Sequence, residues 1–181
     1  FNTIEADPTD EATGGGRWID GSLSPDQPIV AFDETDKRYW KYDRIREANI
    51  FIKNISDRSL TTIDETLAKR LELEARFIRA FIYFEHVKWY GGVPLLTEAQ
   101  VLTNDFSELL VPRESTKKCF EFIVDELNAC VDGLPESYDA ADLGSVTKGA
   151  AMAFLWRVYL FRASPQFNPN HTAEHWNTAY N

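Results

Sequence analysis

Residues 62–94 read TIDETLAKRLELEARFIRAFIYFEHVKWYGGVP, and this stretch decides the fold. Thr62 and Glu65 have the spacing of a capping box, in which a hydroxyl and a carboxylate satisfy free backbone amides, so a helix is expected to start there. Gly91-Gly92, with Pro94 beyond them, are typical of a helix end. The stretch therefore predicts a helix of about 28 residues. Its second half, residues 77–84, is apolar on nearly all sides and should be covered by more than one neighbour.

Apolar residues at helical spacing predict four further helices. They are expected at about 37–54, at 115–132 with Ser115 as its cap, at 147–163 after Thr147, and after Asn170. The only β structure expected is a short strand at 93–97. The fold class is predicted to be all-α, with irregular tetratricopeptide-like helix pairs joined by long loops.

Two tryptophans and two cysteines are assigned to the core of these helices. Trp156 and Trp176 lie in the last two predicted helices and are expected to be buried. Cys119 and Cys130 lie eleven residues apart in one predicted helix, which separates them by about 16 Å and prevents a disulfide between them. Both thiols are expected to face the core as small apolar groups.

The charge divides the chain into two parts. Residues 1–36 hold nine acidic residues and one basic residue, whereas residues 37–181 hold 20 acidic and 18 basic residues. The first part also lacks any helical or strand periodicity, so we interpret 1–36 as an acidic loop arm and 37–181 as a helical-repeat body. The last predicted helix ends after about two turns, so the body is expected to be truncated at its C-terminal end.

Composition and motifs exclude several classes of function. The net charge of -10 argues against nucleic-acid binding, which needs clustered cations. No apolar run reaches the roughly 18 residues of a membrane-spanning helix. No nucleophile motif, phosphate-binding glycine loop or paired-cysteine metal motif is present, so neither an enzyme nor a metal centre is expected.

Three stretches resemble the SusD/RagB family of outer-membrane nutrient-binding lipoproteins. They are WKYDRIREANIFI (40–52), EARFIRAFIYF (74–84) and YGGVPL (90–95). The resemblance implies a helical scaffold of tetratricopeptide-like pairs in a longer protein. It also implies a place on the outer face of the outer membrane, with a lipidated N-terminal Cys as anchor, although that Cys is not among these residues. Family members bind glycans, or in some cases peptides, and deliver them to a SusC-like TonB-dependent transporter.

The arm holds the residues expected to bind a sugar. Trp18 offers a flat ring for the C–H face of a sugar, while Arg17 and Asp20 can bond its hydroxyls. Phe32 is a weaker candidate. In the alternative interpretation, Trp18 pins the arm to the helical body. No cofactor is expected, although the acidic arm could hold a calcium ion.

Two functions remain open at this point. The first is a surface glycan-binding protein that captures oligosaccharides and delivers them to a TonB-dependent outer-membrane transporter. The second is a helical-repeat adaptor that binds a protein or peptide partner and no sugar. Neither function involves catalysis.

Overall fold

The computed structural model describes residues 41–57, 59, 62–100 and 109–180. These residues form five α-helices and one short 3₁₀ helix, and no strand occurs among them. The elements are α2 (Tyr42–Ser56), α3 (Glu65–Tyr90), α4 (Thr116–Gly133), η2 (Ala140–Asp142), α5 (Lys148–Ala163) and α6 (Ala173–Tyr180). The all-α prediction is confirmed for this part of the chain.

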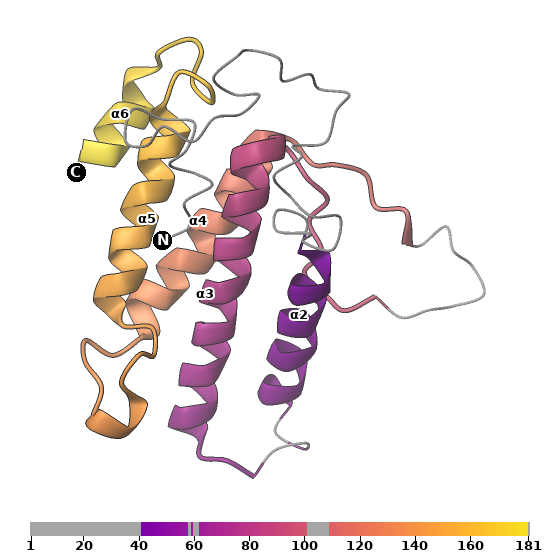
Figure 1. The fold of residues 1–181 in the computed structure, drawn as a ribbon, viewed down its shortest axis with the longest axis vertical. Helices are drawn as coiled ribbons and strands as arrows, with labels where there is room; N and C mark the ends of the chain where they lie inside the picture. Colours follow the sequence, from indigo (N-terminus) through magenta and orange to yellow (C-terminus); the bar gives the residue numbers. More distant parts are fainter. Residues whose placement is uncertain (1–40, 58, 60–61, 101–108, 181) are drawn as a thin grey trace, which may run out of the picture. The chain divides into compact units, whose positions relative to one another are not determined.

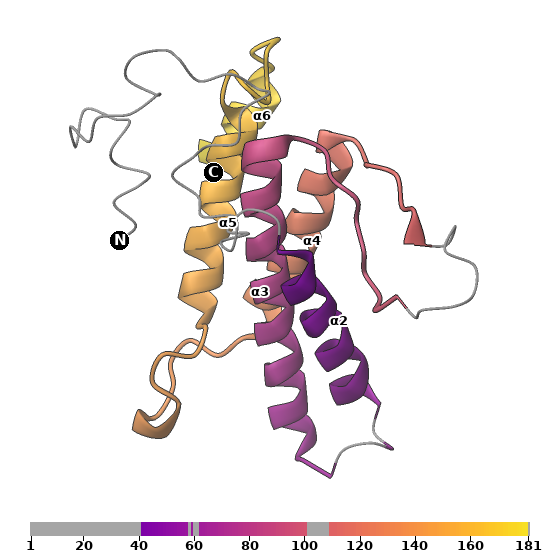
Figure 2. The same cartoon turned by 45° about the vertical axis from the view of Figure 1, so that its right-hand side comes forward.

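The helices pack as antiparallel neighbours in chain order, as the predicted helix pairs require (Figure 1). The long helix α3 lies between α2 and α4, and α5 packs mainly against α4. The last helix, α6, packs against α5, and Figure 2 shows the same neighbours after a turn of the view.

Three of the helices begin at side-chain caps. Ser115 Oγ accepts a hydrogen bond from the backbone N–H of Lys118 at 3.2 Å, and Thr147 Oγ1 accepts one from Ala150 at 3.2 Å. The predicted start of α3 at Thr62 is wrong, because Asp64 is the capping residue. Its carboxylate accepts hydrogen bonds from the backbone N–H groups of Thr66 and Leu67, at 2.8 and 3.2 Å. These two bonds also lower the pKa of the Asp64 carboxyl.

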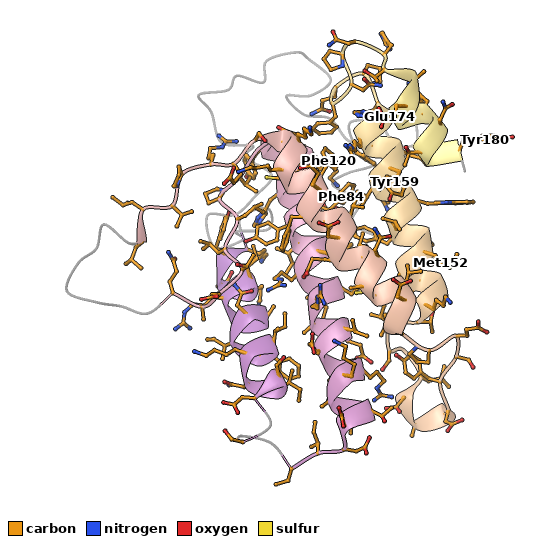
Figure 3. The ribbon with its side chains drawn as sticks, turned by 180° about the vertical axis from the view of Figure 1, so that it is seen from behind. Phe84, Phe120, Met152, Tyr159, Glu174 and Tyr180 are labelled. Atoms are coloured by element: carbon orange, nitrogen blue, oxygen red, sulfur yellow. The ribbon has the colours of Figure 1, made fainter. Side chains whose placement is uncertain are left out.

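Aromatic edge-to-face contacts dominate the core between α3, α4 and α5. The Phe84 ring lies 5.3 Å from Phe154 and 5.1 Å from Phe161, and the Phe120 ring lies 5.1 Å from Phe167. Figure 3 shows Phe84 and Phe120 in this interior. Such ring pairs add about 0.5–1.5 kcal/mol each beyond the apolar area that they bury.

The two cysteines behave as the sequence predicts. Cys119 and Cys130 are both fully buried and both are free thiols. Burial raises the pKa of the Cys130 thiol to about 12 and that of Cys119 above its ordinary value. At neutral pH both side chains are therefore protonated and pack as small apolar groups.

The apolar half of α3 is covered on some of its sides only. Ala80, Tyr83 and Phe84 are fully buried, whereas Ile78 and Phe81 remain 52% and 45% exposed. The helix packs along α2 and α4, and α5 reaches it through the rings of Phe154 and Phe161, so part of the surface of Ile78 and Phe81 stays open.

The prediction of core positions for Trp156 and Trp176 is wrong. Their side chains are 59% and 44% exposed, because the sides of α5 and α6 that carry them face away from the core formed with α4. The residues of α5 that do enter this core are Phe154, Leu155, Val158 and Phe161.

Candidate functional site

The four predicted sugar-binding residues lie outside the described residues. They are Arg17, Trp18, Asp20 and Phe32, and their assignment stays a prediction. The arm as a whole and the possible calcium site in it also lie outside the described residues, so both stay predictions. The structure instead describes the helical body from Lys41, the residue before α2.

The start of α2 is fixed by a buried histidine. His86 Nε2 accepts a hydrogen bond from the backbone N–H of Lys41 at 2.8 Å, and the Tyr42 ring stacks on the imidazole at 5.1 Å. The Tyr42 hydroxyl donates to the carbonyl of Pro94 at 2.6 Å. Because His86 is 1% exposed, burial lowers its pKa to about 4. The ring is therefore neutral at ordinary pH, as the acceptor role of Nε2 requires.

The predicted strand at 93–97 is absent; this segment is held instead by side chains of the surrounding helices. The Tyr83 hydroxyl accepts from the backbone N–H of Leu96 at 2.7 Å and lies 3.0 Å from its carbonyl, to which it donates. Asn49 Nδ2 donates to the same carbonyl at 2.9 Å. These bonds satisfy the Leu96 backbone polar groups without a neighbouring strand.

A buried ionic cluster joins α2, α3 and α4 to this segment. Glu126 accepts from Arg76 Nε at 3.0 Å through one carboxylate oxygen and from Arg79 Nε at 3.0 Å through the other. Arg79 also donates to Asn49 Oδ1 at 2.6 Å and to the Thr97 carbonyl at 3.2 Å. Because its members lie far apart in the sequence and resemble surface charges of amphipathic helices, sequence analysis missed this cluster.

The turn after α3 depends on glycine and on Arg113. A Cβ atom added at Gly92 would lie 2.0 Å from the carbonyl oxygen of Glu114, and Gly91 has a φ of +69°. Arg113 Nε donates to the Gly92 carbonyl at 2.6 Å, and its terminal nitrogen donates to the carbonyl of Tyr90. The glycine pair thus permits a close approach of two backbones as well as the end of a helix.

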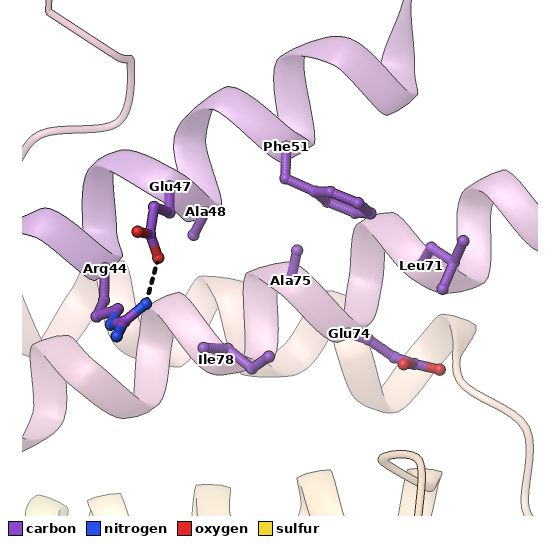
Figure 4. A pocket seen from close by; sticks show the side chains of 8 residues that line it. All are labelled: Arg44, Glu47, Ala48, Phe51, Leu71, Glu74, Ala75 and Ile78. Atoms are coloured by element: carbon purple, nitrogen blue, oxygen red, sulfur yellow. Dashed lines mark hydrogen bonds and ion pairs between the residues drawn. The ribbon is translucent and has the colours of Figure 1, made fainter. Parts of the chain in front are cut away.

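An open apolar groove of about 410 Å³ runs between α2 and α3 (Figure 4). The aliphatic and aromatic side chains that line it are Ala48, Phe51, Leu71, Ala75 and Ile78. Arg44 and Glu47, also in its lining, form an ion pair with each other at 2.8 Å. The third charged residue of the lining, Glu74, pairs with Arg70 at 3.5 Å. The groove therefore offers apolar contact but little uncompensated charge.

A second exposed apolar surface covers the outer side of α5 and α6. It consists of Met152, Trp156, Leu160, Trp176 and Tyr180, which we call the α5–α6 face. Their side chains are between 44% and 88% exposed. Figure 3 shows Met152 and Tyr180 on the side of these helices that points away from α3 and α4.

Neither a metal centre nor a membrane-spanning helix occurs among the described residues. No group of three or more His, Cys, Asp and Glu side chains converges there. His171 and His175 do not share a helix, because His171 has a φ of 50° and precedes the start of α6. None of the described helices combines the length and apolar character needed to span a bilayer.

The comparisons with known proteins agree on one family. Residues 20–160 match the SusD-like family described as starch-binding and associating with the outer membrane. A SusD-like protein of Bacteroides ovatus is 30% identical over 137 residues, which are 75% of this chain and 24% of that protein. The chain thus spans about a quarter of the length of the curated relatives that it matches.

Solved structures share the same helical arrangement. A laminarin-binding SusD-like protein superposes with a TM-score of 0.67 at 26% identity, over 83% of this chain and 30% of that one. A structure solved with xylogluco-oligosaccharide gives a TM-score of 0.63 at 28% identity, over 81% and 27% of the two chains. With most of its length matched by the family and its helices matched by these structures, the chain belongs to the SusD-like family.

Proposed function

We propose that this protein captures oligosaccharides at the cell surface and delivers them to a TonB-dependent outer-membrane transporter. The observation that carries the proposal is the family match over residues 20–160, together with a laminarin-binding relative of the same fold. The relative solved with xylogluco-oligosaccharide adds a second glycan class within the family.

The proposed mechanism is equilibrium binding without bond chemistry. The helical body supplies a rigid frame, in which the buried cluster of Arg76, Arg79 and Glu126 fixes helices and a connecting segment together. Recognition belongs to the arm, where the Trp18 ring covers the apolar face of a sugar. Arg17 donates to sugar hydroxyls and Asp20 accepts from them.

We further propose a location on the outer face of the outer membrane, held by an N-terminal lipid anchor. The family description supports association with that membrane. A glycan bound with modest affinity would be released when the protein moves against a SusC-like partner, so that capture and import are coupled through one complex.

The experiment that tests glycan binding is affinity gel electrophoresis of the 181-residue chain in gels cast with single polysaccharides. The panel includes laminarin, xyloglucan and starch, with bovine serum albumin as a non-binding reference. We expect retardation by at least one polysaccharide and its reversal by free oligosaccharide of the same type. Unchanged mobility across the panel contradicts the proposal and favours the adaptor function.

A further inference from the structure

We draw no further inference here: the strongest candidate, the open apolar groove between α2 and α3 that Phe51, Leu71 and Ile78 line, carries no proposal, because the chain spans about a quarter of the length of its curated relatives and nothing in the structure shows what covers the groove.

Discussion

Glu126 is the carboxylate on which the buried charges of the body depend. Its side chain is 6% exposed and faces Arg76 and Arg79, which are 24% and 7% exposed. Glu126→Ala would leave the buried Arg79 with only the neutral acceptors Asn49 and Thr97. Removal of one member of a buried ion pair costs about 3–5 kcal/mol. We therefore expect urea denaturation to show a loss of this size. Arg44→Ala, which breaks an exposed pair, should leave the midpoint unchanged; equal losses would mean that the cluster is not buried in solution.

His86 makes stability depend on pH. Its pKa is about 4 when folded, against about 6.5 when unfolded, so the unfolded state takes up the proton first as pH falls. The stabilisation by neutral His86 is complete above pH 6.5 and declines toward pH 4, by on the order of 3 kcal/mol. His86→Gln offers an acceptor to Lys41 N–H without titrating. As the pH falls from 6.5 to 4, the difference in unfolding free energy between parent and variant should narrow or reverse. A difference that does not change with pH refutes the assignment of His86 as a buried, neutral acceptor.

At the scale of elements, the sequence predicts the end of α3 correctly, but it predicts neither the start of α3 nor the structure of the segment that follows it. Gly91-Gly92 correctly predicts the end of this helix, because glycine adopts the positive φ found at Gly91 without the steric clash that a Cβ atom would cause. The start is misassigned, because Thr62 and Asp64 are both good capping residues and local pattern cannot choose between them. The sequence of 93–97 predicts a strand, but the hydrogen-bond partners of Leu96 are the side chains of Tyr83 and Asn49, which belong to helices and not to a neighbouring strand.

Two glycine substitutions test whether the turn after α3 requires a glycine at position 92. Gly92→Ala would drive a Cβ atom into the Glu114 carbonyl at 2.0 Å, so we expect a loss of about 1–3 kcal/mol. Gly149→Ala, in the first turn of α5, meets only Thr147 Oγ1 at 3.9 Å and should stabilise by about 0.5 kcal/mol. Thermal unfolding of both variants provides the measurement. Equal effects of the two changes would contradict the close approach of backbones at Gly92.

At the scale of the whole molecule, the helices were predictable and their outer surfaces were not. The sequence pattern places Cys119 and Cys130 in the core correctly. It cannot show whether an apolar side has a neighbour, which is why Trp156 was assigned to the core. The assignment of Trp18 and Arg17 to sugar binding rests on side-chain chemistry and family resemblance. Both residues lie outside the described part of the chain, so the assignment stays a prediction.

The central claim is that a helical frame carries a glycan site located on the arm. The most direct test is isothermal titration of the parent, Trp18→Ala and Trp156→Ala with the oligosaccharide that reverses gel retardation. We predict that Trp18→Ala weakens binding about fivefold or more, since loss of one stacking ring removes about 1 kcal/mol or more, whereas Trp156→Ala binds like the parent. Equal affinity of parent and Trp18→Ala, or a loss confined to Trp156→Ala, would contradict the account.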